Sequence, residues 1–306
     1  MNRKNFIQLA AFGTTNALFN KNPISLSKSR KKLIAKDVQD YLRSLIEVEE
    51  PSVDRIIIGD PNTEVTKIGT AWTPYWKTLK EANARGVNTL VVHEPTFYTH
   101  WDLDRKDLGA DYYSSPSPAR EEYFEQRDKK KAWIEDHNMV IIRCHDVLDK
   151  IPDWGIPYSF GKALGFKNED IIRSKKFYNV YGIEKKPAIE VARYIASHVK
   201  KLSQPGVAFY GDANYMVSSV GLGTGAISNP MNYAELEADL HIAIDDSIRT
   251  WTQTPYAEDT GRPLVVLNHG TSEEPGAKAL GRHLRDTFQD YEVIHFEQGC
   301  TYKWIE

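Results

Sequence analysis

Apolar and polar residues follow two distinct rhythms along most of the chain, from about residue 34 to its end. Apolar positions that repeat every three to four residues predict helices, and short apolar runs bounded by Gly, Pro, Asn or Asp predict strands. The helical rhythm covers residues 35–48, 73–85, 121–137, 187–202 and 275–289, with shorter pieces within 152–166 and at 233–238. The strand rhythm covers residues 54–58, 65–71, 87–92, 139–144, 176–182, 207–220, 264–268 and 292–296.

This alternation of strands and helices predicts an α/β fold, because mostly parallel or mixed sheets need helices over their faces. Residues 161–261 contain strands with a more alternating pattern and predict a second lobe, which leaves residues 34–160 and 262–306 for the first lobe. Residues 101–122 are polar, lack clear periodicity and predict a surface loop or insertion. Ligands of such sheets gather just beyond the carboxyl ends of the strands.

The first 33 residues differ in kind from the rest. They have a basic start at Arg3 and Lys4, a mildly apolar stretch to residue 19, and no acidic residue before Asp37. This outline is typical of a leader peptide, and residues 3–7 are similar to a relaxed twin-arginine export signal. We therefore expect residues 1–33 to be a leader and linker that directs export to the periplasm. The alternative is a cytoplasmic protein with an amphipathic N-terminal helix.

Composition narrows the classes of partner. The 306 residues are 41% hydrophobic, which is enough for a sizeable core, and no run of about 18 apolar residues is present to span a membrane. A net charge of −3 provides no broad basic field, so nucleic acid is not an expected partner. The two cysteines, Cys144 and Cys300, form no disulfide framework, and we expect both to be ordinary buried thiols.

Three predicted strands are each followed by a histidine, and each histidine has a carboxylate close by in the sequence. The three pairs are His93 with Glu94, His145 with Asp149, and His269 with Glu273. Three neutral imidazoles and three carboxylates could hold one or two divalent cations. Two such ions about 4 Å apart would form a hydrolytic centre.

Each pair also has an ordinary interpretation. A single histidine after a strand is more often a packing or surface residue, and Asp149 alone suits a turn, with Asp146 competing for any ligand role. Glu273 alone suits the first turn of a helix, with Ser272 as the expected N-cap. The same pairing at three independent strand ends favours a metal site.

Other candidates carry weaker patterns. The glycine-rich residues 221–225 could cradle an anion, but they lack the lysine of a phosphate loop, and a tight turn is favoured. Asp245 and Asp246 predict a polar strand end in the second lobe, and a ligand role there is less favoured. Three tryptophans near the first two strand ends could line a pocket or simply pack: Trp72, Trp76 and Trp101.

Several short motifs in a fixed order carry a family resemblance. They are Gly59-Asp60-Pro61 with residues 64–68, residues 91–95 around His93, His145 with Asp149, and His269 with Glu273 ahead of Pro275-Gly276. Over residues 35–306 the chain resembles the Nif-three-like family, ring-forming dinuclear metal proteins often labelled GTP cyclohydrolase 1 type 2 homologues.

The resemblance implies a two-lobed α/β subunit with mixed sheets flanked by helices and a metal site at the carboxyl ends of strands. It also implies a homohexameric ring and two divalent metal ions per subunit, which could be Fe, Mn or Zn. By the same resemblance, four residues match metal ligands and His145 matches a histidine at the site; the four are His93, Asp149, His269 and Glu273.

One departure from the family pattern concerns Glu94, because the family usually has a second histidine at this position. A carboxylate there can still bind metal, and it favours harder ions such as Mn or Fe over Zn. It could instead act as a base.

The leading functional hypothesis is a metal-dependent hydrolase for a small-molecule substrate of the nucleotide or cyclic-amide type. A metal-bound hydroxide would attack the substrate, with Glu94 or His145 transferring protons. The alternative is a non-catalytic ring that acts as a scaffold or metal carrier. A third hypothesis is an interaction protein whose metal site is structural and closed.

Overall fold

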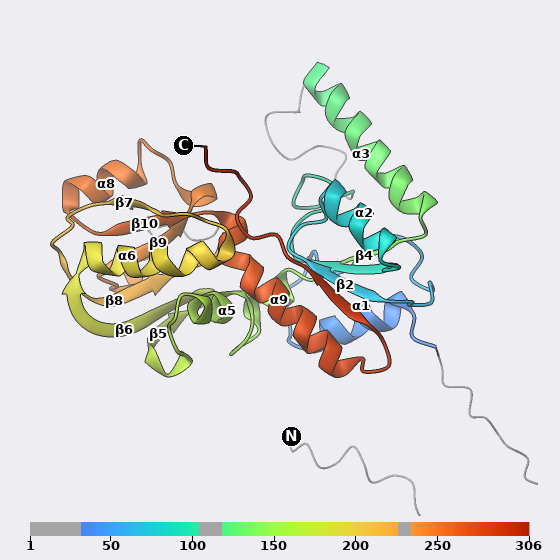
Figure 1. The fold of residues 1–306 in the computed structure, drawn as a ribbon, viewed down its shortest axis with the longest axis horizontal. Coiled ribbons are helices and arrows are strands. Elements are labelled where there is room, and N and C mark those ends of the chain that lie inside the picture. The colour runs from blue at the N-terminus through green and yellow to red at the C-terminus, as the bar shows by residue number, and fades with distance from the viewer. Residues whose placement is uncertain (1–31, 104–117, 226–233, 306) are drawn as a thin grey trace, which may run out of the picture. The chain divides into compact units, whose positions relative to one another are not determined.

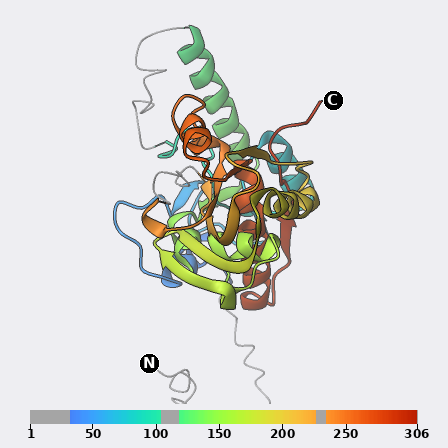
Figure 2. The ribbon, with the colours of Figure 1, turned by 90° about the vertical axis from the view of Figure 1, so that its left-hand side faces the viewer.

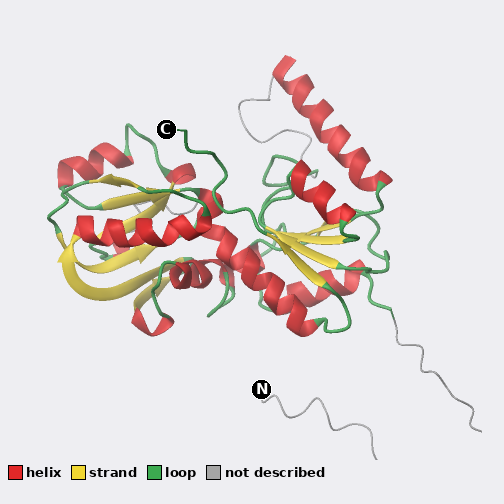
Figure 3. Ribbon diagram, in the orientation of Figure 1, coloured by secondary structure: helices red, strands yellow, loops and turns green. Residues whose placement is uncertain are grey.

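Two mixed sheets organise the computed structural model, which describes residues 32–103, 118–225 and 234–305. Figures 1 and 3 show helices packed over each sheet, which is the two-lobed α/β arrangement that the sequence predicts. We call the sheet that contains the first strand of the chain, with its helices, the first lobe, and the other the second lobe. Residues 1–31 of the predicted leader at 1–33 and most of the predicted insertion at 101–122 lie outside the described residues.

The first sheet has five strands in the order β1-β4-β3-β2-β11. They are β1 (Ile56–Ile58), β2 (Ile68–Ala71), β3 (Thr89–Val92), β4 (Val140–Arg143) and β11 (Val293–Phe296). The last four run parallel, and β1 pairs antiparallel with β4 at one edge. Every residue of β2, β3 and β4 is buried, which explains the largely apolar runs that mark them in the sequence.

Helices cover both faces of the first sheet. They are α1 (Ala35–Ser44), α2 (Trp76–Ala84), α3 (Pro118–Asp136), α4 (Asp146–Lys150) and α9 (His269–Thr287). A further helix, α5 (Ile156–Ala163), packs against α9 and contributes Phe160 to the core of the second sheet. Val91 of β3 packs in one core with α1 and α9, whereas its neighbours Leu90 and Val92 pack in another with α2 and α3. This division follows from strand geometry, because successive side chains point to opposite faces.

The second sheet has six strands in the order β5-β6-β8-β9-β10-β7. They are β5 (Ile171–Lys175), β6 (Tyr178–Pro187), β7 (Ala208–Tyr210), β8 (Met216–Leu222), β9 (Leu240–Ile244) and β10 (Leu264–Leu267). β8, β9 and β10 run parallel, and the other pairs are antiparallel. Figure 2 turns this lobe toward the viewer.

Two helices accompany the second sheet, α6 (Ala188–Val199), which shares its apolar core, and α8 (Gln253–Thr260). Short 3₁₀ helices occur at η2 (Asn168–Asp170), η3 (Lys200–Leu202), η5 (Ala234–Leu236) and η6 (Asp245–Ser247). The described helices lack the combination of length and hydrophobicity that crossing a bilayer requires.

The chain returns to the first lobe through α9. This helix starts directly after β10 of the second sheet and packs against β2 and β11 of the first (Figure 1). β10 pairs with β9 and β7, so residues 264–267 belong to the second lobe, although the predicted boundary at 262 assigned them to the first. The boundary between the lobes therefore lies at the start of α9.

The start of α9 differs from the prediction. The sequence suggested a helix from residue 275 with Ser272 as its N-cap, because proline favours the first turn of a helix. Instead Asn268 is the N-cap, its side chain accepts a hydrogen bond from the Thr271 amide, and Pro275 lies inside the helix. His269 and Glu273 are therefore separated by one turn of regular helix and share a face.

Smaller differences have similar local causes. α3 begins at Pro118 rather than at 121, and the predicted strand at 207–220 is divided into β7 and β8. β5 was not predicted, because its side chains are mostly exposed and polar and so leave no apolar pattern. Cys144 is buried as expected, but Cys300 is partly exposed.

Candidate metal centre

The three predicted histidines come together where the first sheet meets the start of α9. His93 follows β3 directly, and His145 follows the parallel neighbour β4 by two residues, so both lie at one edge of the first sheet. His269 and Glu273 lie in the first two turns of α9, after β10 of the second sheet. The candidate site thus combines strand ends from two sheets.

His93, His145 and Asp149 form one set of possible metal ligands, which we call group one. The two imidazole rings stack with centroids 4.5 Å apart and an interplanar angle of 8°. Asp149 lies one turn beyond His145, with its carboxylate oxygens 3.8 Å from His93 Nε2 and 3.6 Å from His145 Nδ1. One donor atom from each residue lies within 4.8 Å of the others, so the three could hold an ion.

His93, Glu94 and Glu273 form a second set, group two. Glu273 Oε2 lies 3.3 Å from His93 Nε2. His269 lies beside this group, with its Nε2 3.2 Å from Glu94 Oε1 and 2.9 Å from Glu273 Oε2. Because His93 belongs to both groups, the two candidate ion positions adjoin.

Each of the three histidines has a protein acceptor for its Nδ1–H, which fixes the tautomer and leaves the Nε2 lone pair for an ion. The acceptors are the Cys144 carbonyl for His93 at 3.3 Å, Asp146 for His145 at 2.8 Å, and Asp246 for His269 at 2.7 Å. Asp146 and Asp246 therefore orient histidines, a role that their sequence positions did not reveal.

The residues of the centre fit a divalent cation. The Nε2 atoms of His93 and His269 are buried and make no hydrogen bond among the described residues, although Glu273 Oε2 lies 3.3 and 2.9 Å from them. Buried polar atoms are normally satisfied, and an ion would satisfy both nitrogens. The surrounding carboxylates Glu94, Asp149 and Glu273 supply the negative charge that such an ion requires.

The pKa shifts of the residues in the centre also favour a bound cation. Burial would lower the pKa of His93, but the carboxylates of Glu273 and Asp149 outweigh it and raise this pKa to about 10. Burial raises the pKa of Asp149 to about 6, against the opposing effect of His145. The burial of Glu273 is outweighed by His93 and His269, so its pKa falls well below its usual range. The carboxylates thus draw positive charge into the centre, a role suited to a metal ion.

Two residues that the sequence offered only as weaker candidates, Trp72 and Gly225, lie against Glu273. The indole of Trp72 donates a 2.7 Å hydrogen bond to Glu273 Oε2, so this tryptophan orients a ligand. Gly225 has a φ of +59°, and a Cβ there would lie 2.4 Å from Glu273 Oε1 and 3.1 Å from His269 Nε2. Only glycine suits this position. Of the glycine-rich residues 221–225, the first two belong to β8 and the last packs on the centre.

A buried arginine lies behind the centre. Arg143 of β4 donates from Nε to the His93 carbonyl at 3.0 Å and from Nη1 to the His100 carbonyl, and it pairs with Asp102 at 3.4 Å. Its Nη2 lies 3.7 Å from Glu94 Oε2. In the sequence, Arg143 is the single charge within the apolar run 139–144, a sign that was available but not used.

Asp102 and Lys130 join Arg143 in what we call the Arg143 cluster. Asp102 Oδ1 accepts hydrogen bonds from the amides of Thr96 and Phe97 at 2.6 and 2.9 Å. Lys130 Nζ donates to the Thr96 carbonyl at 2.8 Å. Burial lowers the pKa of Lys130 to about 8, with Asp102 opposing this shift. The cluster holds the loop that carries His93 and Glu94, and no pattern in the sequence marks Asp102 or Lys130.

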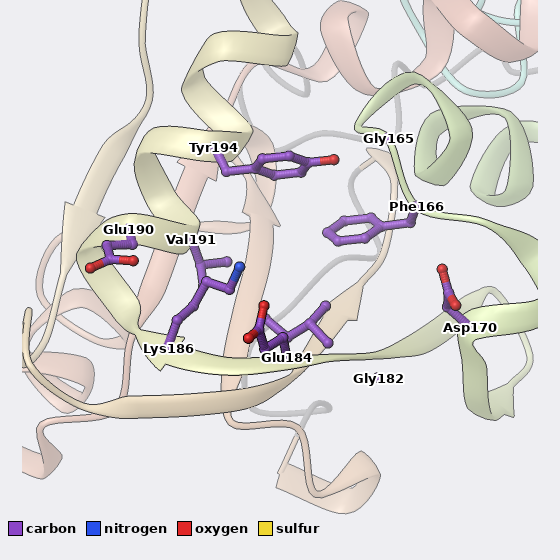
Figure 4. A pocket seen from close by; sticks show the side chains of 10 residues that line it. Gly165, Phe166, Asp170, Gly182, Glu184, Lys186, Glu190, Val191 and Tyr194 are labelled. Atoms are coloured by element: carbon purple, nitrogen blue, oxygen red, sulfur yellow. The ribbon is translucent and has the colours of Figure 1, made fainter.

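A separate cavity of about 480 Å³ lies in the second lobe beside β6 and α6 (Figure 4). Phe166, Val191 and Tyr194 give it an apolar wall, and Glu184 and Glu190 add carboxylates. Its lining residues are distinct from those of the candidate metal centre.

Comparison with known proteins supplies an independent observation. The family model described as Duf34/NIF3 (NGG1p interacting factor 3) matches residues 118–299. A relative from Chlamydia muridarum, a "GTP cyclohydrolase 1 type 2 homolog", is 23% identical over 266 residues, which is 84% of this chain and 97% of the relative.

Solved structures share the fold. Staphylococcus aureus protein SA1388 superposes with a TM-score of 0.71 at 16% identity, covering 90% of this chain and 100% of that one. A Bacillus cereus protein related to NIF3 superposes with a TM-score of 0.67 at 14% identity, with the same coverage of both chains.

Proposed function

Since the chain belongs to the Duf34/NIF3 family, we propose that it holds two divalent metal ions per subunit and hydrolyses a small-molecule substrate with them. One observation carries this proposal: two ligand groups adjoin at His93, His269 lies beside the second as a further nitrogen donor, and the Nε2 atoms of both histidines are buried without hydrogen bonds among the described residues. The proposed ligands are His93, Glu94, Asp149, His269 and Glu273.

The donor set supports a particular range of metals. By the family resemblance, Glu94 stands where a second histidine is usual, so the proposed donor set has three carboxylates and two imidazoles. Carboxylate oxygens favour harder ions, whereas nitrogen and sulfur donors suit zinc. We therefore propose Mn or Fe ahead of Zn.

Divalent ions at these positions would activate water and polarise a substrate carbonyl or phosphoryl group. His145 is placed to move a proton, because its Nδ1 donates to Asp146 and its Nε2 keeps a lone pair. Its side chain is 19% exposed, whereas that of His93 is fully buried. Glu94 faces both His269 and Arg143, an arrangement that supports a ligand role over a role as a base.

The substrate class follows only from the relatives. The Chlamydia muridarum relative carries a name that refers to GTP cyclohydrolase, which supports a nucleotide or a cyclic amide as the substrate. We also propose that subunits assemble into a homohexameric ring, and that the N-terminal residues direct export. Native mass spectrometry tests the first of these, and the mass of the mature N-terminus tests the second.

A non-catalytic scaffold or metal carrier is the second candidate function. The observation that favours it is burial: the side chains of His93 and Glu273 are 0% and 4% exposed. Structural metal sites are typically closed, whereas hydrolytic sites keep an open position.

Elemental analysis of purified protein, combined with a screen of phosphoesters, nucleotides and cyclic amides, tests the proposal. The wild type should contain about two ions per chain, and His269→Ala should lose at least one of them together with turnover. His137→Ala is the matched control, because this exposed histidine just past the end of α3 contacts Trp133, by a 2.7 Å hydrogen bond to its carbonyl and by ring stacking, and belongs to neither ligand group. A wild type with less than about 0.2 ions per chain contradicts the metal proposal. Full metal without turnover favours the carrier or scaffold.

A further inference from the structure

We propose that Arg143 is a positioning residue that makes Glu94 a one-oxygen metal ligand and so sets the preference of the centre for hard ions. The inference rests on the proposed metal-binding function and deepens it.

The two oxygens of Glu94 face different partners. Oε1 lies 3.2 Å from His269 Nε2, on the side of group two. Oε2 lies 3.7 Å from Arg143 Nη2, on the side of the buried arginine. With Oε2 drawn toward the guanidinium, the carboxylate presents a single oxygen to the ion, as an imidazole presents a single nitrogen.

The guanidinium is held in place by other groups. Its Nε and Nη1 donate to the carbonyls of His93 and His100, and Nη1 also faces Asp102. Arginine has a rigid planar fork, so these contacts fix the direction of Nη2 as well. Nη2 is buried and has no hydrogen-bond partner among the described residues, which leaves its charge directed at Glu94.

Charge compensation explains why Glu94 faces the buried guanidinium of Arg143. An arginine is permanently charged, and burying it without an opposite charge is costly. Asp102 on one side and Glu94 on the other compensate Arg143. A neutral imidazole at position 94 would leave Nη2 facing an uncharged group. We therefore infer that Glu94 and Arg143 act as a pair.

A double-mutant cycle tests this pairing through metal affinity. The four proteins are the wild type, Arg143→Met, Glu94→His and the double variant, each titrated with Mn²⁺ and with Zn²⁺ against a competing chelator. We expect Arg143→Met to weaken Mn²⁺ binding about 10- to 100-fold, as the loss of a partner behind a metal ligand typically does. In the Glu94→His background the same substitution should change Mn²⁺ and Zn²⁺ affinity by less than about threefold.

A matched arginine controls for loop anchoring. Arg55 also donates to a carbonyl of this loop, that of Trp101 at 3.4 Å. Arg55→Met should leave the ratio of Mn²⁺ to Zn²⁺ affinity unchanged. Equal losses from Arg143→Met in both backgrounds, or none in the wild type, would overturn the proposed pairing.

A second measurement needs no variant and so does not depend on Arg143→Met folding. In a crystal structure of the manganese-loaded wild type, Glu94 should bind through one oxygen, with the other facing Arg143. Bidentate coordination by Glu94 would overturn the inference while leaving the metal proposal intact. A wild type that binds no metal would refute the proposed function itself, so the two failures are distinguishable.

Discussion

Two buried polar clusters lie side by side in the first lobe. Their polar atoms find hydrogen-bond and charge partners in different ways. In the Arg143 cluster the charges of Arg143 and Asp102 oppose each other, and Asp102 also accepts two backbone hydrogen bonds. In the candidate metal centre, carboxylates lie close to imidazoles. Two buried imidazole nitrogens, those of His93 and His269, make no hydrogen bond among the described residues.

This difference separates a stabilising cluster from a binding cluster. The charged groups that hold the loop mostly satisfy one another, because each unsatisfied buried group costs about 1–3 kcal/mol. The exception is Nη2 of Arg143, which makes no hydrogen bond among the described residues and faces Glu94. The donor atoms of an ion-binding site, by contrast, direct their lone pairs at one another. Glu94 connects the two clusters, since one of its oxygens faces each of them.

The largest expected effect follows from removing a charge inside the metal centre. Glu273 contacts His93, His269 and Trp72, so Glu273→Gln should weaken metal binding by more than about 100-fold, or about 2.7 kcal/mol. The measurement is metal affinity by competition with a chelator. Glu274→Gln is the matched control, because this neighbouring buried carboxylate pairs with His295 at 2.6 Å and should affect stability only. Similar losses of metal affinity in both variants would show that the effect of Glu273→Gln is not specific to the candidate metal centre.

The next effect follows from removing a charge in the Arg143 cluster, which should change stability rather than metal binding. Asp102→Asn removes the opposing charge and weakens two backbone hydrogen bonds, so it should lower the free energy of unfolding by about 2–3 kcal/mol. Denaturant unfolding with and without a chelator measures this loss, which should be the same in both conditions. A loss seen only in metal-loaded protein would show that the two clusters are not separate.

A smaller effect is expected from the wall of the centre. Gly225→Ala would place a methyl group against Glu273 and strain a left-handed backbone, so metal affinity should fall about 10-fold. Gly206→Ala is the control, because a Cβ there meets no atom within 4 Å. Unchanged affinity in Gly225→Ala would show that Glu273 can move without consequence.

The smallest effect concerns pH. The pKa of Lys130 is about 8 in the folded protein, below its value near 10.4 in an unfolded chain. Between these values the unfolded chain binds more protons, so the stability contribution of Lys130 should rise by about 1 kcal/mol from pH 8 to pH 9. The difference in unfolding free energy between the wild type and Lys130→Met measures it. A difference that is constant over this range would contradict the assigned burial.

Much of the fold could be predicted because buried parallel strands leave strong marks. The runs ending at Val92 and Arg143 are mostly apolar, and the histidines that follow them identify one half of the candidate centre. β5 and the start of α9 were missed for physical reasons. An exposed polar strand has no apolar rhythm, and Pro275 resembled a first-turn residue although it lies inside α9.

The supporting residues of the candidate site were harder to find. Asp102, Lys130 and Asp246 act through contacts between segments far apart in the chain, and nothing in their local sequence indicates this. Gly225 is recognisable only once its Cβ is seen to collide with Glu273. Spacing alone can propose ligands, but it cannot propose the residues that hold them.

Calorimetric titration of the chelator-treated wild type with Mn²⁺ tests the central claim most directly. The two adjoining groups, with His269 as a further donor beside group two, should give saturable binding of about two ions per chain, with proton release as imidazoles and carboxylates take up metal. His137→Ala should bind the same number, and Glu273→Gln should lose at least one site. Absence of saturable binding by the folded wild type would contradict the account.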